Sequence, residues 1–352
     1  MKNKIYSFKE IVLEINKHLR FFFKEKNKAL EKDIKECCMR GGKRLRPALV
    51  YYGYKLFSDN NKSDKEIIKL SIALELIHTF FLIHDDYMDK SNLRRGKKTM
   101  HEKYKDEYFA KITNLKEAMH YGNSIAVLVG DYSYMLGTDA ILSSNFSAEI
   151  KIKVIKKINE MISDTIVGQE LDIKIQSIKG SISEADILAM YKLKTAKYSF
   201  YYPLQIGAIL SQSKIRYEKL TSDYAMSCGI AYQIKDDIID LFESKNTGKP
   251  YGQDIIEGKK TLLIIKAYEK ASSQEKRVLK QALGNNRIKT KDINKVKKII
   301  EKTGAYEYCK QKNREYINKA KKALNELAQK DLNKKVISHL EFLADFSIIR
   351  KH

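Results

Sequence analysis

The sequence predicts an all-α protein, folded as a single large helical bundle. Proline occurs only at Pro47, Pro203 and Pro250. The long stretches between these prolines carry apolar residues at three- and four-residue intervals, the spacing of helices that bury one face. Alternating apolar and polar residues bounded by turn pairs, which are typical of half-buried strands, are hard to find. We therefore expect helices throughout and few strands or none.

The composition is that of a globular protein. The 352 residues exceed the usual length of one domain, but no break in composition forces a division, so we expect one domain over residues 1–352. Apolar runs such as 125–129 and 262–265 are far shorter than the roughly 20 residues that span a bilayer. The N-terminal residues form no signal-peptide core. We therefore expect a cytoplasmic protein without a transmembrane segment.

The charge and the cysteines exclude some functions and leave others open. The formal net charge of +23 would attract nucleic acid, anionic lipid or phosphorylated small molecules. No nucleic-acid module or aromatic stacking platform is recognisable, so we expect no nucleic-acid partner and a solvated basic surface. The four cysteines have neither the density of a disulfide scaffold nor paired metal-ligand spacing. We expect reduced structural thiols at Cys37, Cys38, Cys228 and Cys309.

Turn-forming residues divide the chain into helical segments. The expected breaks lie near residues 41–42, 59–63, 91–98, 180–183, 246–258 and 284–291. Between them, Leu70 to Asp89 and Tyr224 to Phe242 are apolar on more than one face, so both segments should lie in the middle of the bundle. Each of these two core segments carries acidic residues at or near its end.

Both core segments contain the same acidic pattern, DDxxD. The first has Asp85, Asp86 and Asp89, and residues four apart share one face of a helix. The second cluster repeats this pattern with Asp236, Asp237 and Asp240. A single exposed DDxxD is ordinary, but two in core helices are not, because buried carboxylates need a compensating cation. Magnesium is commonly held by carboxylates together with substrate phosphates, so we expect a magnesium site completed by a diphosphate.

Basic residues accompany the acidic clusters. The segment Gly41-Gly42-Lys43-Arg44-Leu45-Arg46-Pro47 places three cations and two glycines at an expected helix start. Glycine allows close approach of the backbone, arginine gives paired contacts to phosphate oxygens and lysine gives a point charge. A basic turn without function would explain this segment equally well when it is taken alone. Further cations and one hydroxyl lie near expected helix ends, at Arg94, Arg95, Lys194, Thr195, Lys249 and Lys259.

With these motifs, the chain resembles the trans-type polyprenyl diphosphate synthase family, which includes farnesyl and geranylgeranyl diphosphate synthases. The resemblance runs from about Gly41 to Lys260 through GGKRLRP, ELIHTFFLIHDDYMD, LRRG, HYGNSIAVLVGD, GQELDI, KTAKYSF, YQIKDDIID and GKPYGQDIIEGK. It implies one helical domain around a deep central cavity, in a homodimer, with the two acidic clusters facing each other across the cavity mouth. It also implies a prenyltransferase that condenses isopentenyl diphosphate with dimethylallyl or geranyl diphosphate.

The resemblance assigns roles to residues, motif by motif. Magnesium, with three ions expected, would be held by Asp85, Asp86, Asp89, Asp236, Asp237 and Asp240. The allylic diphosphate would contact Arg94, Lys194, Lys249 and Lys259. The isopentenyl diphosphate would contact Gly42, Lys43, Arg46, His78 and Arg95. The reaction centre or the surroundings of the metals would be lined by Thr195, Gln169, Asp172, Gln233 and Asp254, with Lys194, Thr195, Gln233 and Gln169 taking part in catalysis. Looser candidates are Tyr198 and Tyr232 for the cavity wall and Arg350 with Lys351 for a lid.

Two phenylalanines bear on the length of the product. Phe81 lies four residues before Asp85, so it shares that helical face about one turn, or roughly 5.4 Å, deeper. Phe80 is its bulky neighbour. Aromatic residues at both positions resemble the farnesyl-forming members, which implies a fifteen-carbon product, with geranylgeranyl diphosphate as the alternative. Ordinary core residues would account for both rings as well.

Two other classes of protein share part of this pattern. A class I terpene cyclase uses DDxxD and magnesium, but its second metal motif normally differs and it needs no cradle for a second diphosphate. A noncatalytic partner subunit would share the fold, but none of the six aspartates that catalysis requires is missing here. Both alternatives stay open at the level of the sequence.

Overall fold

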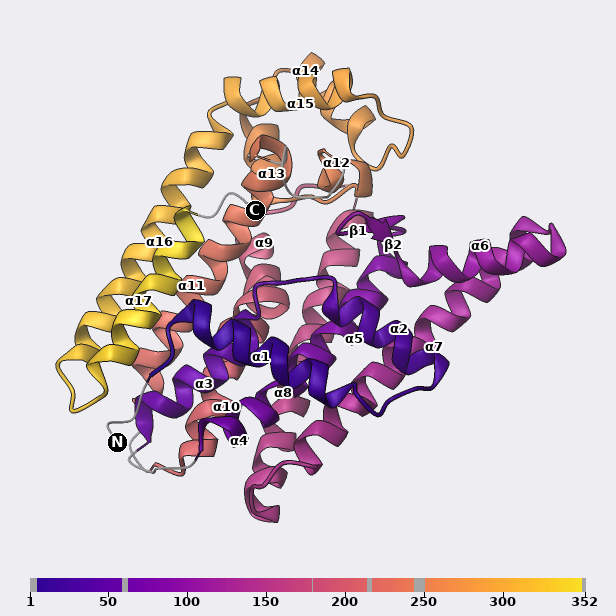
Figure 1. The fold of residues 1–352 in the computed structure, drawn as a ribbon. Helices are drawn as coiled ribbons and strands as arrows, with labels where there is room; N and C mark the ends of the chain where they lie inside the picture. The colour runs from indigo at the N-terminus through magenta and orange to yellow at the C-terminus, as the bar shows by residue number, and fades with distance from the viewer. Residues whose placement is uncertain (1–4, 59–62, 179, 214–216, 244–250, 350–352) are drawn as a thin grey trace. The chain divides into compact units, whose positions relative to one another are not determined.

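The computed structural model describes residues 5–58, 63–178, 180–213, 217–243 and 251–349. These residues are helical almost throughout (Figure 1), which confirms the all-α class. The strands that they contain are β1 (Leu93–Arg94) and β2 (Lys97–Lys98), which pair as a short antiparallel hairpin. The helices form two compact units. The first comprises Met1–Lys157 with Pro203–Lys214, and the second comprises Ile158–Tyr202 with Ile215–His352.

The first unit is built around α5 (Ala73–Met88), which buries Leu74, Leu76 and Ile77 completely. The expected core helix of residues 70–89 is therefore confirmed, although its first residues belong to α4 (Asp64–Ser71). Helix α7 (Leu115–Leu142) packs along α5 and also along α6 (Met100–Ile112). The other helices of this unit are α1 (Phe8–Phe22), α2 (Ala29–Met39), α3 (Leu45–Phe57), the start of α8 (Ala148–Ser177) and most of α10 (Tyr202–Ser211).

Among the described residues, two segments are long and apolar enough to cross a membrane by length and composition alone. They are Asp64–Met88, which covers α4 and α5, and Leu115–Leu142, which is α7. Polar residues interrupt the apolar runs of both segments, so neither is visible in the sequence as an uninterrupted span. In the first segment 67% of the apolar window is buried inside the protein, as in the core helix of a globular unit. In α7 the buried share is 44%, so much of its apolar surface faces outward.

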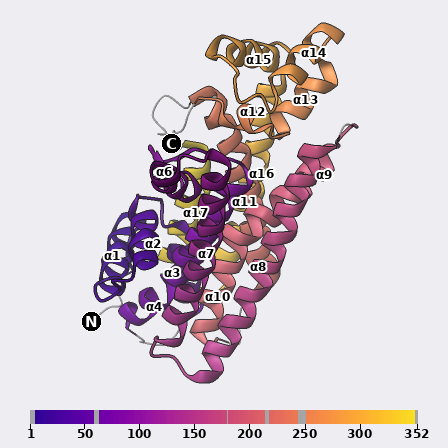
Figure 2. The ribbon, with the colours of Figure 1, turned by 90° about the vertical axis from the view of Figure 1, so that its right-hand side faces the viewer.

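The second unit is built around α11 (Glu218–Ile238), which runs beside α16 (Ala305–Ala328) and α17 (Lys334–Ile349) (Figure 1). The segment Tyr224 to Phe242 is largely buried, as expected. The unit also contains the rest of α8, α9 (Glu184–Tyr191), α12 (Gln253–Glu257), α13 (Leu262–Lys270), α14 (Ser273–Ala282) and α15 (Thr290–Lys302). Figure 2 shows α12, α13, α14 and α15 gathered together.

In the described part of the second unit, two segments have π-helical hydrogen bonding, which the sequence did not predict. They are η1 (Lys192–Tyr201), which follows α9, and η2 (Ile239–Glu243), which continues α11. Segments of this kind are often found at functional sites because the wider turn redirects side chains. Here η1 carries Lys194 and Thr195, and η2 carries Asp240.

Candidate functional site

The first acidic cluster lies at the C-terminal end of α5, in the first unit. Asp85 and Asp86 occupy the last turn of this helix, and Asp89 is its C-cap residue. The C-terminal end of a helix carries a partial negative charge, which disfavours carboxylates and favours cations. Three carboxylates at this end therefore form a local excess of negative charge that a bound cation would relieve.

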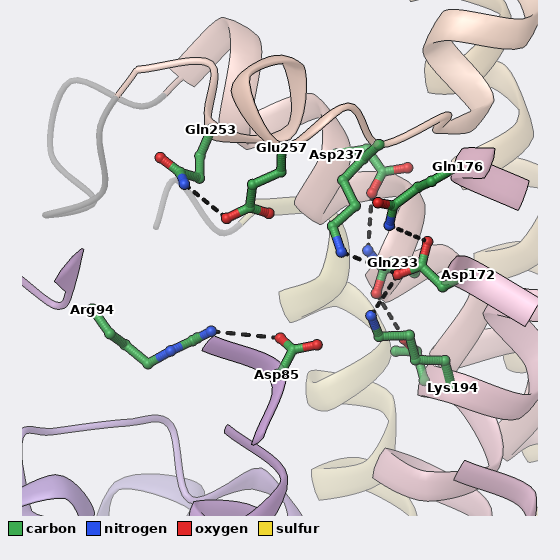
Figure 3. A network of polar contacts seen from close by, with 11 residues as sticks. Asp85, Arg94, Asp172, Gln176, Lys194, Gln233, Asp237, Gln253 and Glu257 are labelled. Atoms are coloured by element: carbon green, nitrogen blue, oxygen red, sulfur yellow. Dashed lines mark hydrogen bonds and ion pairs between the residues drawn. The ribbon is translucent and has the colours of Figure 1, made fainter. Parts of the chain in front are cut away.

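Arg94 of β1 already offsets part of this charge. Its Nε atom donates to Asp86 Oδ1 at 2.6 Å, and its Nη2 atom lies 3.5 Å from Asp85 Oδ2 (Figure 3). The Asp86 side chain is only 6% exposed, whereas that of Asp85 is 24% exposed. Asp85 is thus the more accessible of the two to a ligand, and Arg94 lies where it can contact both carboxylates and an added anion.

A group of basic residues lies in the first unit, and we call Gly42, Lys43, Arg46 and Arg95 the basic cradle. Gly42 has a φ of +136°, and a Cβ atom added there would lie 3.1 Å from the Arg95 guanidinium. Arg95 itself donates to the Gly41 carbonyl oxygen. The GGKRLRP turn and the hairpin that carries Arg95 are therefore in contact, and a side chain at position 42 would interfere with this contact.

His78 of α5 lies in the field of this cradle. Burial lowers the pKa of His78 well below its ordinary value, and the positive charges of Arg46, Arg95, Arg94 and Arg44 act in the same direction. His78 is therefore a neutral imidazole near neutral pH. It can donate one hydrogen bond and accept another, but it adds no positive charge.

Arg44 differs from the other cations of the GGKRLRP segment. It is 4% exposed, and its guanidinium donates to Glu75 Oε2 at 2.6 Å, the Cys38 carbonyl at 2.8 Å and Asn16 Oδ1 at 2.9 Å. These bonds join α1, α2 and α5. Arg44 is therefore a buried residue that stabilises the position of this turn. Lys43 and Arg46 are partly exposed, so they are the cations of the segment that can contact a ligand.

The second acidic cluster lies where α11 passes into η2, in the second unit. Asp236 is partly exposed, whereas Asp237 and Asp240 are 4% and 8% exposed. Burial raises the pKa of Asp237 to about 8, and the neighbouring Asp236 and Asp240 add to this rise, although hydrogen bonds from Tyr191 and Gln233 oppose it. As in the first cluster, the protein gathers carboxylates in a place where a cation would stabilise their charged form.

A chain of hydrogen bonds connects Asp237 to η1. The hydroxyl group of Thr195 donates to Gln233 Oε1 at 2.7 Å, and Gln233 Nε2 donates to Asp237 Oδ1 at 2.9 Å (Figure 3). The other oxygen of Asp237 accepts from the hydroxyl group of Tyr191. Three expected site residues, Thr195, Gln233 and Asp237, are therefore joined directly.

Asp172 of α8 brings two expected phosphate-binding lysines together. Its Oδ2 atom lies 2.7 Å from Lys194 Nζ and 3.2 Å from Lys259 Nζ (Figure 3). Burial acts to raise the pKa of Asp172, but the charges of Lys194 and Lys259 outweigh it and keep the pKa below its usual value. The carboxylate is therefore charged, and it holds two ammonium groups side by side as a pair that an anion can bridge.

Two glycines bring the backbone of η1 close to its neighbours. A Cβ atom added at Gly168 of α8 would lie 2.5 Å from the backbone nitrogen of Lys194. A Cβ atom at Gly229 of α11 would overlap the backbone of Ala196. Only glycine allows this approach. The GQ pair of the GQELDI motif thus contains a glycine that sets the distance between α8 and the segment carrying Lys194.

The donor sets of both clusters fit magnesium, since they offer carboxylate oxygens, the hard ligands that this ion prefers. Within the described part of the chain, no three His, Cys, Asp or Glu side chains converge closely enough to hold a metal ion without further ligands. Substrate phosphates and water usually supply the remaining ligands of magnesium. Each cluster would therefore depend on the diphosphate to complete its metal site.

Four other residues expected near the reaction centre lie in the second unit. Gln169 follows Gly168 on α8, and the amide of Asp254 donates to Asp240 Oδ2 at 3.1 Å. Tyr198 is buried in η1, and the ring of Tyr232 packs edge-on against that of Phe200 at 5.7 Å. The described residues do not include Lys249, Arg350 or Lys351.

Tyr191 was not identified from the sequence, although it is 1% exposed and contacts Asp237. It lies three residues before Lys194. Nothing in the neighbouring sequence distinguishes it from an ordinary core tyrosine. Its contact with Asp237 bridges residues 46 positions apart, so only the tertiary structure reveals it.

Comparisons with known proteins show the family to which this chain belongs. A family model described as polyprenyl synthetase matches residues 27–302. The geranylgeranyl diphosphate synthase of Saccharolobus solfataricus is 32% identical over 352 residues, covering 98% of this chain and 97% of that protein. The geranylfarnesyl diphosphate synthase of Aeropyrum pernix is 30% identical, covering 88% of this chain and 91% of that protein. A solved geranylgeranyl pyrophosphate synthase from Corynebacterium glutamicum, complexed with isoprenyl diphosphate and magnesium, aligns at a TM-score of 0.84 and 27% identity, over 97% of this chain and 98% of its own.

Proposed function

Because this chain is a prenyltransferase of the polyprenyl synthetase family, we propose that it condenses isopentenyl diphosphate head-to-tail with an allylic diphosphate. The observation that carries the proposal is the pair of DDxxD clusters on core helices, each accompanied by lysines or arginines that can hold phosphate oxygens. Acidic clusters alone would bind cations. Together with Arg94, Lys194 and Lys259 they suit a metal-bound diphosphate.

The aspartates of the two clusters would hold magnesium, and through it the allylic diphosphate. Bound magnesium would supply Lewis-acid stabilisation of the negative charge on the departing diphosphate. Asp85 and Asp89 are partly exposed in the first cluster, and Asp236 is partly exposed in the second, which favours these three as direct ligands. Arg94 would turn from its two carboxylates toward the diphosphate oxygens as the cation neutralises those carboxylates.

Lys194 and Lys259 would bind oxygens of the same diphosphate. Their shared partner Asp172 keeps both ammonium groups ready, so that little reorganisation is needed as negative charge develops. Departure of the diphosphate leaves an allylic carbocation. The hydroxyl oxygen of Thr195 and the amide oxygen of Gln233 carry partial negative charges that can stabilise this cation. Gln169 would be a further amide, since it follows Gly168, which lies against the backbone of Lys194.

The isopentenyl diphosphate would occupy the basic cradle of the first unit. Lys43, Arg46 and Arg95 supply cations, and His78 supplies a neutral donor. Gly42 would let the backbone approach the phosphates, since it carries no Cβ atom. The double bond of this substrate would attack the carbocation, and loss of a proton to the released diphosphate would complete the reaction without a protein base.

We propose geranylgeranyl diphosphate, with twenty carbons, as the product. The fifteen-carbon expectation has no support among the relatives compared above, which are named for geranylgeranyl and geranylfarnesyl diphosphate. The ring of Phe80 packs against His84 at 4.7 Å and against Tyr134 of α7 at 5.9 Å. Phe80 lies five residues before Asp85, roughly 140° around the helix, so only Phe81 shares the face of Asp85. One ring on that face would stop the growing tail later than two.

We further propose a cytoplasmic homodimer that forms through α7. Tyr121, Leu128, Met135 and Leu142 recur at seven-residue intervals along this helix, and each is at least 36% exposed. A seven-residue apolar stripe is the pattern through which helices pair. A second copy of the chain is the occupant that fits, because the same stripe on both copies can pair about a two-fold axis.

The test of the proposed function is a product assay with purified protein. The enzyme is incubated with magnesium, isopentenyl diphosphate and dimethylallyl, geranyl or farnesyl diphosphate, and the products are identified by mass spectrometry. We expect geranylgeranyl diphosphate from all three primers, and longer products after Phe81→Ala. A cyclic hydrocarbon would instead indicate a terpene cyclase. No product under any condition, from folded protein, would indicate a noncatalytic subunit.

A further inference from the structure

The hydroxyl group of Tyr191 joins three segments of the second unit. Tyr191 is the last residue of α9 and directly precedes η1. Its hydroxyl group donates to Asp237 Oδ2 and accepts a hydrogen bond of 3.0 Å from the backbone amide of Leu262. Leu262 is the first residue of α13, where helix geometry leaves amides without a partner inside the helix. One buried oxygen atom thus connects the end of α9, the second acidic cluster and the start of α13.

Both oxygens of Asp237 accept hydrogen bonds from side chains. Oδ2 accepts from Tyr191 and Oδ1 accepts from Gln233 Nε2 at 2.9 Å, while the residue is 4% exposed. Asp236, the preceding residue, is partly exposed. The two adjacent aspartates therefore differ in their exposure to solvent. Asp236 is partly exposed, whereas Asp237 is buried and held by two hydrogen-bond donors.

The fixed carboxylate lies at a structurally sensitive point. Helix α11 ends at Ile238, and the π-helical segment that carries Asp240 begins at Ile239. Asp240 in turn accepts from the amide of Asp254 at the start of α12. A rotation of Asp237 would leave the Tyr191 hydroxyl and the Asp237 oxygen without their partners, which is costly for buried polar groups. The helix would have to shift to restore them, and Asp236 and Asp240 would move with it.

We propose that Tyr191 is a positioning residue of the second acidic cluster: it fixes Asp237 and thereby sets the orientation in which Asp236 and Asp240 meet magnesium. This inference rests on the proposed function, because it assumes that the cluster binds the metal with diphosphate. Asp237 acts through the hydrogen-bond network, and the partly exposed Asp236 acts as a metal ligand. Residues that orient metal ligands in this way usually affect metal affinity by about 10- to 100-fold.

The test compares two buried tyrosines that lose only a hydroxyl group. Tyr191→Phe removes the contact with Asp237. The matched control, Tyr224→Phe, removes a buried hydrogen bond of 2.8 Å to the Leu340 carbonyl, also in the second unit. Magnesium is titrated into each full-length protein with inorganic diphosphate present, and binding is measured by calorimetry. The rise of Tm with magnesium concentration gives a second, independent readout.

We expect Tyr191→Phe to weaken magnesium binding about 10-fold, whereas Tyr224→Phe binds within about two-fold of the parent protein. Equal magnesium binding by the two folded variants would overturn the inference and leave the proposed function intact. Failure of the parent protein to bind magnesium with diphosphate would overturn both.

A second pair of variants keeps the inference testable if Tyr191→Phe does not fold. Asp237→Asn keeps the shape of the side chain, and its amide oxygen can still accept a hydrogen bond from the Tyr191 hydroxyl group, whereas Asp236→Asn removes the charge of the more exposed aspartate. We expect the magnesium affinity to fall several-fold less for Asp237→Asn than for Asp236→Asn. An equal or greater loss for Asp237→Asn would contradict the assigned roles.

Discussion

At the scale of single residues, the structure separates neighbouring cations that the sequence alone cannot tell apart. Lys194 and Lys197 both lie on η1 and both pair with an aspartate, at 2.7 Å and 2.8 Å. Only Lys194 shares its partner, Asp172, with a second lysine, Lys259. One carboxylate balances only one of the two ammonium charges, so the group formed by Asp172, Lys194 and Lys259 keeps a net positive charge, which supports the proposed phosphate site.

Replacement of these two lysines tests this distinction. We expect Lys194→Ala to raise KM for the allylic diphosphate about 10-fold or more, since a hydrogen bond to a charged group contributes about 1.5–3 kcal/mol. Lys197→Ala should leave KM within about two-fold of the parent value. Steady-state kinetics with varied allylic substrate give both numbers, and equal effects of the two replacements would contradict the assignment.

The cysteines give a second prediction at this scale. Burial raises the pKa of Cys37 to about 11 and that of Cys38 to about 12, and it also raises the pKa values of Cys228 and Cys309. Because only the thiolate reacts, a raised pKa lowers reactivity at neutral pH. We expect all four thiols to react slowly with Ellman's reagent in the native protein and rapidly in guanidinium chloride. Fast reaction of any native thiol at pH 7 would contradict this.

At the scale of elements, close packing around η1 positions the segment that carries Lys194 and Thr195. Gly168 of α8 and Gly229 of α11 have no side chain, so both helices can pack directly against the backbone of η1. The π-helical turns themselves have no sequence signal, because the wider hydrogen bonding arises from how these helices pack rather than from the local residues.

A methyl group at position 229 tests this packing. Gly229→Ala should lower the free energy of unfolding by about 1–3 kcal/mol, the usual cost of overpacking, even though alanine favours helices by about 1 kcal/mol relative to glycine. The control is Gly180→Ala, where the nearest atom lies 3.8 Å from the added Cβ. Urea denaturation measures both, and an unchanged or raised stability of Gly229→Ala would show that the contact is not tight.

At the scale of the whole molecule, the exposed apolar stripe of α7 predicts how copies of the chain associate. Leu128 is 54% exposed at the middle of this stripe, and burial of a glutamate there would be costly. We expect Leu128→Glu to convert the dimer into a monomer in light scattering at micromolar concentration. The control Leu13→Glu changes a leucine that is 60% exposed on α1 and should leave the dimer intact. A monomeric parent protein would refute the proposed interface.

Several features of the fold and of the function could be predicted from the sequence. The helical class, the two core segments and the family were predicted correctly, since hydrophobic periodicity and the DDxxD motifs are local properties of the chain. The residues of each acidic cluster were likewise visible as motifs. The expected fifteen-carbon product found no support, because the direction in which Phe80 and Phe81 point depends on the helices packed against them.

The sequence by itself determined which chemical groups the protein has and in which order they occur. The tertiary structure decided what each group contacts: Arg44 became an internal support, His78 a neutral imidazole and Tyr191 a partner of Asp237. The physical reason is that hydrogen bonds and pKa values depend on distances in space. Residues such as 191 and 237 become neighbours only after their helices have packed.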